Sequence, residues 1–244
     1  MTLTRLSAAF AALLATASVA GAATITITDF NPTDYSAATA GGSFVGTDFE
    51  AEGRAMGEGQ VGSSLSTSVG TFSRLSGVGS GGTVRDLPGN DGTQLALRDG
   101  NVYGRSDTHG GSWFLDSNDT HGMVWNVSTG SLFDTVVFTI TDGSEFGGSV
   151  RVSSGGESAD QGIDGRRGDG NVSLVTVIFD NPTNAATIIL GHYANANSQN
   201  LRTNDGFSID GTQVGLAPVP LPASLPLLLL GAGALYGLRR RAQG

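Results

Sequence analysis

The chain has 244 residues, of which 39% are hydrophobic, 14% are charged and 38 are glycine. Its 13 basic residues are all arginine, and its 22 acidic residues leave a net charge of −9. The lack of lysine excludes a P-loop nucleotide site and Schiff-base catalysis, and the lack of cysteine excludes disulfide frameworks, zinc–thiolate sites and thiol catalysis.

Residues 1–23 have the three parts of a secretory signal peptide. Arg5 precedes an apolar, alanine-rich stretch from Leu6 to Ala20, and small residues follow it. A basic start, an apolar middle and a small-residue exit are typical of such signals. We therefore expect export, with cleavage after Ala22 or Ala23; the alternative is an amphipathic N-terminal helix of the domain.

Residues 24–216 are predicted to form one all-β domain, a jelly-roll-like β-sandwich. Polar and apolar residues alternate in many short segments, and after the signal peptide no helical stripe reaches ten residues. The predicted strands are Thr24–Thr28, Ser43–Phe49, Thr93–Arg98, Trp113–Leu115, Met123–Val127, Leu132–Thr141, Gly148–Ser153, Val172–Phe179, Ala186–Leu190, Phe207–Asp210 and Thr212–Val214.

Turns and long loops are predicted between these strands. Asp-Gly pairs recur along the domain and favour turns with positive φ. The pair at Asp142 predicts a hairpin that joins Leu132–Thr141 to Gly148–Ser153. The glycine- and serine-rich segments Ala55–Gly82 and Ser153–Gly170 are predicted to be surface loops.

The domain is strongly acidic. Residues 24–216 contain nine arginines and all 22 acidic residues, a net charge of −13. We therefore expect no nucleic-acid partner and repulsion from anionic membrane surfaces.

Two binding sites are conceivable within the domain. Tyr103, Trp113, Trp125 and Tyr193 lie among polar residues and are candidates for contacts with a glycan, with core packing as the alternative. Glu50, Glu52 and Asp210 are candidate calcium ligands, because hard cations prefer carboxylate oxygens. The segments around them resemble the terminal strands of carbohydrate-binding jelly rolls, which share a calcium ion. No other cofactor is predicted.

No catalytic residue is predicted. The histidines His109, His121 and His192 lack the spacing of a zinc helix, and no G-x-S-x-G nucleophile elbow is present. A secreted hydrolase with paired carboxylates remains an alternative, although no pair of acids is singled out.

Residues 217–244 resemble a membrane anchor. Leu221–Leu238 is an uncharged stretch of 18 residues, and three arginines follow it, Arg239, Arg240 and Arg241. As a helix this stretch would be about 27 Å long, just enough for a bilayer core. The arginine cluster is expected to stay in the cytoplasm while the acidic domain lies outside.

The tail also resembles a known sorting signal. Val219, Pro220, Leu221, Pro222 and Ala223, followed by a leucine-rich span and terminal arginines, resemble the VPLPA variant of the PEP-CTERM sorting domain. The resemblance implies processing by an exosortase, in a Gram-negative bacterium that makes extracellular polysaccharide. The pentapeptide would be recognised and the arginines would act as a stop. The alternative is a plain anchor that is never processed.

Three body segments are similar to β-sandwich domains found with such tails: Phe133–Asp142, Phe146–Val152 and Asn204–Gly211. We therefore expect a non-enzymatic structural or adhesive protein. It would be held in the inner membrane before sorting, and then delivered to the cell surface or polysaccharide matrix. The alternatives are a calcium-dependent carbohydrate-binding module and a secreted hydrolase.

Overall fold

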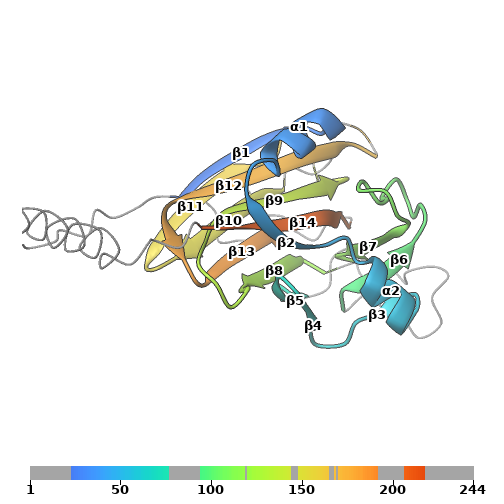
Figure 1. Ribbon diagram of the computed structural model, residues 1–244. Helices are drawn as coiled ribbons and strands as arrows, with labels where there is room; N and C mark the ends of the chain where they lie inside the picture. The colour runs from blue at the N-terminus through green and yellow to red at the C-terminus, as the bar shows by residue number, and fades with distance from the viewer. Residues whose placement is uncertain are drawn as a thin grey trace, which may run out of the picture.

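A computed structural model of the protein describes residues 23–76, 94–118, 120–143, 148–164, 168, 170–191 and 206–217 (Figure 1). These ranges contain two antiparallel β-sheets and two short helices. The predicted signal peptide up to residue 22 and the predicted tail from residue 218 lie outside them. Of the helices within the described ranges, neither has the length and apolar character needed to cross a membrane.

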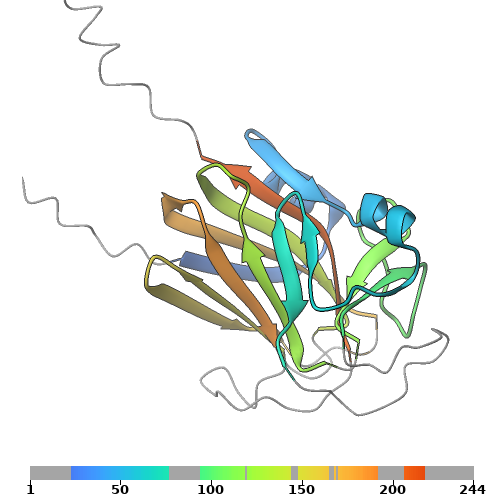
Figure 2. The same ribbon diagram turned by 90° about the horizontal axis from the view of Figure 1, so that it is seen from below.

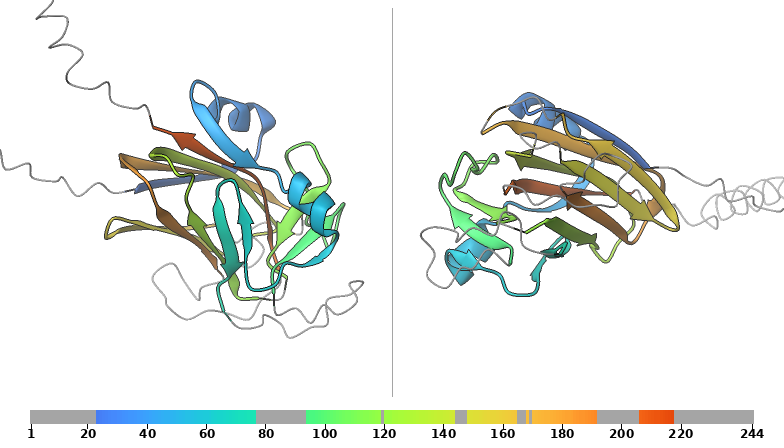
Figure 3. Two further views of the ribbon diagram at one scale, coloured as in Figure 1. Left: turned by 60° about the horizontal axis from the view of Figure 1, so that its bottom comes forward. Right: turned by 180° about the vertical axis from the view of Figure 1, so that it is seen from behind.

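The larger sheet, sheet A, has eight strands. Its strands in spatial order are β1 (Ala23–Asp29), β12 (Val172–Thr183), β9 (Phe133–Thr141), β14 (Ser208–Leu216), β7 (Trp113–Asp116), β6 (Ala96–Asp99) and β3 (Gly59–Gln60). The eighth strand, β2 (Ser43–Thr47), pairs with the second half of β14, whereas β7 pairs with its first half. The last strand of the described residues, β14, therefore lies inside the sheet. Figure 3 (right) shows the other side of this sheet, where the blue β1 lies beside β12.

The smaller sheet, sheet B, has six strands. They are β11 (Glu157–Gly162), β10 (Ser149–Ser154), β13 (Ala186–Gly191), β8 (Gly122–Val127), β5 (Gly70–Arg74) and β4 (Leu65–Thr67). Figure 2 shows the hairpin of β4 and β5 beside β8.

A chain of buried aromatic rings joins the two sheets. Phe72 of β5 stacks on Trp125 of β8 with ring centroids 5.0 Å apart, and Trp125 meets Phe138 of β9 edge-on at 5.7 Å. All three side chains are fully buried, and they belong to one hydrophobic cluster with residues of both sheets. The prediction of an all-β sandwich is confirmed, in that two antiparallel sheets pack around one shared hydrophobic cluster.

Two seven-residue helices were missed by the sequence analysis. Helix α1 (Pro32–Ala38) is capped by Asn31, whose side chain accepts a hydrogen bond from the Thr33 N–H, and proline occupies its first turn. Its Tyr35 packs with Val137 on the outer face of sheet A. Helix α2 (Glu50–Met56) lies near β3 and β6 (Figure 1). Both helices are too short to show a helical hydrophobic period.

The predicted hairpin at Asp142 is wrong. Strand β9 lies in sheet A and β10 lies in sheet B, so the connection crosses from one sheet to the other. Strand β9 is already paired on both edges, with β12 and β14, and has no free edge for β10. The positive φ expected at the Asp-Gly pair is nevertheless present, at 69° for Asp142.

The two predicted loops also contain strands. Segment Ala55–Gly82 holds β3, β4 and β5, and segment Ser153–Gly170 holds β11. The glycine and serine content of these segments favoured a loop prediction. The strands form nevertheless, because strand propensity depends strongly on context and pairing with neighbouring strands stabilises them.

Candidate functional site

The segment Gly100–Ser112, called here the β6–β7 loop, contains the most exposed of the predicted glycan-contact residues. At its tip Val102 and Arg105 exchange two backbone hydrogen bonds, of 2.9 and 3.0 Å. The two residues between them, Tyr103 and Gly104, have φ values of 52° and 82°. Positive φ at both central residues is the conformation of a type I′ turn, which glycine, asparagine and aspartate adopt most readily.

Tyr103 is an unusual residue for this position. Four non-glycine residues in the described ranges have positive φ, and the other three, Phe49, Asn118 and Asp142, are buried. Tyr103 is 50% exposed, and the guanidinium carbon of Arg105 lies over its ring, 5.6 Å from the centroid. The turn thus holds an aromatic ring at the surface in a conformation that burial does not explain.

Asp210 fastens the second half of the loop to sheet A. Its Oδ2 accepts hydrogen bonds from the backbone N–H groups of Thr108 at 2.7 Å and His109 at 3.0 Å. Asp210 is 1% exposed, and its other oxygen, Oδ1, has no hydrogen-bond partner. Burial raises the pKa of Asp210 to about 6, an effect larger than the lowering by these hydrogen bonds.

A bulge in β14 brings Asp210 to the loop. The pairing with β9 shifts between Asp210 and Gln213, and Gly211 has a φ of 56°. The hydroxyl of Tyr35 donates to the Gly211 carbonyl at 2.7 Å, and the Tyr35 ring lies 4.6 Å from that of His109. Helix α1, β14 and the β6–β7 loop therefore meet at this point.

Glu50 fastens the end of the same loop. Its Oε1 accepts hydrogen bonds from the backbone N–H groups of Trp113 at 2.8 Å and Ser112 at 2.5 Å. These bonds lower the pKa of Glu50, and Arg54 contributes to the lowering through Oε2, which it contacts at 2.7 Å. Two residues predicted to bind calcium thus hold one loop by its backbone.

The third predicted calcium ligand has a separate partner. Glu52 accepts a hydrogen bond of 3.0 Å from the Thr47 hydroxyl. Over the described ranges, no group of three or more His, Cys, Asp or Glu side chains is placed to hold a metal ion. The structure therefore does not bring Glu50, Glu52 and Asp210 together, and calcium binding stays a prediction.

A buried ion-pair network supports the first half of the loop. Asp116 of β7 contacts Arg98 of β6 through Oδ2 at 3.2 Å and Arg105 of the loop through Oδ1 at 3.4 Å. Arg98 also donates to the Asn118 side-chain oxygen at 3.2 Å. All four residues are at most 4% exposed. This network was not predicted from the sequence, although a charged residue in each of two apolar strands was a signal for it.

The other predicted aromatic contacts do not form one surface. Trp125 is fully buried, and its indole N–H donates to the Val69 carbonyl at 3.0 Å, so its assignment to a glycan contact is corrected to core packing. Trp113 is half-buried against the main core, and its ring lies over Gly53 of α2. Tyr193 lies outside the described residues. Tyr103 is the candidate that remains exposed.

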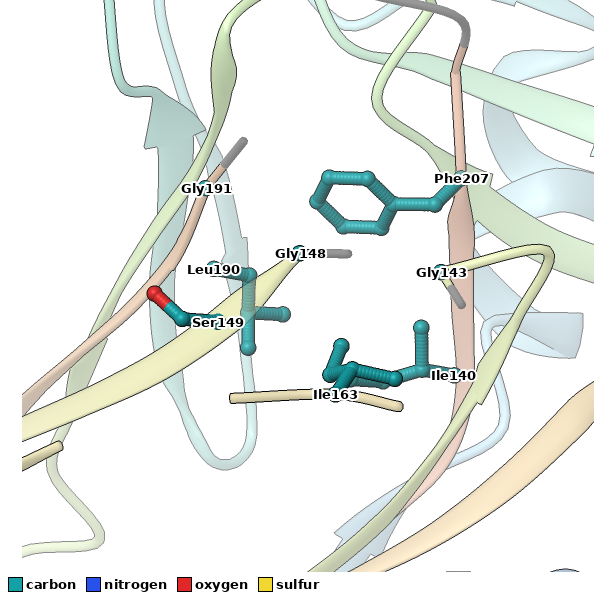
Figure 4. Close-up of a pocket in the computed structure, with 8 residues that line it drawn as sticks. All are labelled: Ile140, Gly143, Gly148, Ser149, Ile163, Leu190, Gly191 and Phe207. Atoms are coloured by element: carbon teal, nitrogen blue, oxygen red, sulfur yellow. The ribbon is translucent and has the colours of Figure 1, made fainter. Parts of the chain in front are cut away.

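Two cavities in the described part of the chain are too small for an ordinary ligand. One, of about 10 Å³, is lined by Ile140, Ile163, Leu190 and Phe207, with the Ser149 hydroxyl directed away from these apolar groups (Figure 4). The other, of about 160 Å³, lies between β1 and β11 and is lined by polar groups that include Asp29, Asp164 and Gln161. Small-molecule sites typically measure about 300–1,000 Å³.

Comparisons with known proteins assign no family. No protein-family model matches the sequence, and no curated protein matches it. Among solved structures, the chain is similar to the K2 cleaved adhesin domain of Lys-gingipain. The identity is 10% and the TM-score 0.40, and the match covers 71% of this chain and 100% of that one.

Proposed function

We propose that this is an exported protein of the bacterial cell surface or polysaccharide matrix, with a structural or adhesive role and without enzymatic activity. The observation that carries the proposal is the order of features in the C-terminal sequence. The motif Val219–Ala223, an uncharged leucine-rich span and the cluster Arg239–Arg241 follow one another without interruption. A signal-peptide sequence at residues 1–23 supports the same destination.

The two sequence signals have distinct roles in this proposal. The N-terminal signal directs export, and the C-terminal span holds the chain in the inner membrane with its arginines in the cytoplasm. An exosortase then recognises Val219–Ala223 and processes the tail. The sandwich, whose described strands run from Ala23 to Leu216, becomes the delivered product.

The contacts of three acidic residues favour a structural role for the sandwich. Asp116 is held between two arginines, and Asp210 and Glu50 bind backbone N–H groups of the β6–β7 loop. Each of these carboxylates fixes a loop or balances a buried charge. Rigid presentation of a surface loop suits adhesion, because it lowers the entropy lost on binding.

The mass of the chain recovered from its native host tests the sorting proposal. Wild-type protein from the envelope and the medium is expected to end between Val219 and Ser224, with or without an added group. The double variant Pro220→Ala and Pro222→Ala is expected to retain residues 225–244, because the recognised motif is lost. Pro218→Ala, just outside the motif, is the matched control and is expected to be processed. A wild-type chain that retains its complete tail would overturn the proposal.

A further inference from the structure

We propose that Tyr103 is a stacking platform for an uncharged sugar ring of an extracellular polysaccharide. This inference rests on the proposed function, because delivery to the surface or matrix would place the protein among such polymers. The C-terminal tail indicates where the protein is delivered but not what it binds, and this inference names a binding residue and a class of ligand.

The conformation of the turn is the first argument. Tyr103 occupies the first central position of a two-residue turn with a φ of 52°, where its Cβ is unfavourable and where asparagine or glycine is strain-free. Tyr103 is 50% exposed as a residue, so burial of the side chain does not compensate this strain. Strained residues at the surface are often retained for function.

The fixed cation against one face of the ring is the second argument. The guanidinium carbon of Arg105 lies over the ring at 5.6 Å from its centroid, and the guanidinium is held by Asp116 at 3.4 Å and by the Val102 carbonyl at 3.3 Å. The remainder of the loop is tied down by Asp210 and Glu50. A ring held in place on one side, and half exposed, is preorganised to bind a flat partner.

The chemistry of the ring and its surroundings selects the ligand class. The face of an aromatic ring carries partial negative charge, which attracts weakly positive C–H groups such as those on a sugar ring. Asp99 and Asn101, which precede the turn in the chain, are both exposed, and polar side chains of this kind can hydrogen-bond to sugar hydroxyls. The net charge of −13 over residues 24–216 repels anionic polymers and favours an uncharged one.

Native gel electrophoresis in embedded polysaccharide tests this inference. The exported chain recovered from its host is run through gels that contain a neutral glucan, a galactomannan, a xylan or polygalacturonate. The wild-type chain is expected to be retarded by at least one neutral polymer and not by polygalacturonate. Calorimetry with the hexasaccharide of the retarding polymer then gives the affinity.

Three variants distinguish a loss of sugar binding from a loss of folding stability. Tyr103→Asn is expected to weaken binding by about tenfold or more, while it fits the turn better and keeps the thermal midpoint at or above that of the wild type. Tyr103→Phe is expected to keep the affinity within about threefold, because the ring face remains. Leu132→Ala removes another exposed apolar side chain and is the control that should bind normally.

The outcomes for sugar binding and for sorting are independent. Absence of retardation in all three neutral gels, preference for polygalacturonate, or unchanged affinity of Tyr103→Asn would each overturn the inference. Processing of the C-terminal tail is read from the mass and does not involve Tyr103. A processed wild-type chain without sugar binding would refute the platform alone, and an unprocessed one would refute the proposed function.

Discussion

Replacement of Asp210 by asparagine should change how the stability of the protein depends on pH. Asp210 is buried, and one of its oxygens lacks a hydrogen-bond partner. Burial raises its pKa from the ordinary 3.8 to about 6 in the folded state. Asparagine offers one oxygen to the same backbone N–H groups but carries no charge.

The magnitude follows from the difference between the two pKa values. Between about pH 4 and pH 6 the folded state keeps a proton on Asp210 that the unfolded state has lost. The free energy of unfolding therefore falls as pH rises through this window, by about 1.4 kcal/mol per pH unit and about 3 kcal/mol in total. Below pH 4 the stabilisation by the bound proton is complete, and above pH 6 no further loss occurs. Asp210→Asn removes this dependence.

Urea unfolding of the exported chain at pH 4, 5, 6 and 7 measures the effect. The free energy of unfolding of Asp210→Asn, relative to wild type, should increase by about 2.5 kcal/mol from pH 4 to pH 7. Asp34→Asn, which removes an exposed carboxylate of α1, is the control and should keep the wild-type trend. A relative stability of Asp210→Asn that stays constant within about 0.5 kcal/mol would refute the reasoning, because burial would then not dominate at this carboxylate.

Three further predictions concern the scaffold and are checked by urea or thermal unfolding of the same chain. Gly122→Ala should lose about 2 kcal/mol or more, because Gly122 has a φ of 145° and a new Cβ there would meet a backbone carbonyl of β13. Gly130→Ala should lose about 1 kcal/mol, because Gly130 has a φ of 75° but its Cβ would enter open space. Equal losses for the two variants would contradict the steric argument. Arg98→Met should lose about 3–5 kcal/mol, because it leaves Asp116 with one arginine. Arg54→Met should change stability by less than about 1 kcal/mol, because the Arg54 side chain is 73% exposed and its hydrated charge gains little from the pairing with Glu50. Trp125→Phe should lose about 1–3 kcal/mol, since it keeps an aromatic ring but removes the indole hydrogen bond and some volume. An unchanged stability would contradict the prediction that the hydrogen bond and the packing of this ring stabilise the fold.

Most strands of the sandwich were predictable from the sequence, because their apolar residues either alternate with polar ones or form short continuous runs. The strand predicted at Leu132–Thr141 forms as β9, Phe133–Thr141. Which strands pair with each other was not predictable in the same way. The hairpin expected at Asp142 does not form, because both edges of β9 are taken by strands that are distant in sequence.

The candidate site was predictable in its residue types but not in its contacts. Asp210 and Glu50 were singled out as hard-cation ligands, yet their hydrogen-bond partners, Thr108 and Trp113, lie 102 and 63 residues away. Such contacts depend on the sheet order and leave no local sequence pattern. Tyr103 was found because it is aromatic among polar residues; its strained backbone became visible only with the turn around it.

The position of β14 has a consequence for the order of folding. This strand, the last described in the chain, lies between β9 on one side and β7 and β2 on the other. A chain that crosses a membrane with its N-terminus first would therefore hold sheet A in three unconnected parts, β1–β12–β9, β7–β6–β3 and the lone β2, until residues 208–216 emerge. Sheets that depend on such long-range pairing fold slowly. Arrival of β14 would be the step that joins these parts, so truncation within β14 should abolish the sandwich instead of shortening one edge.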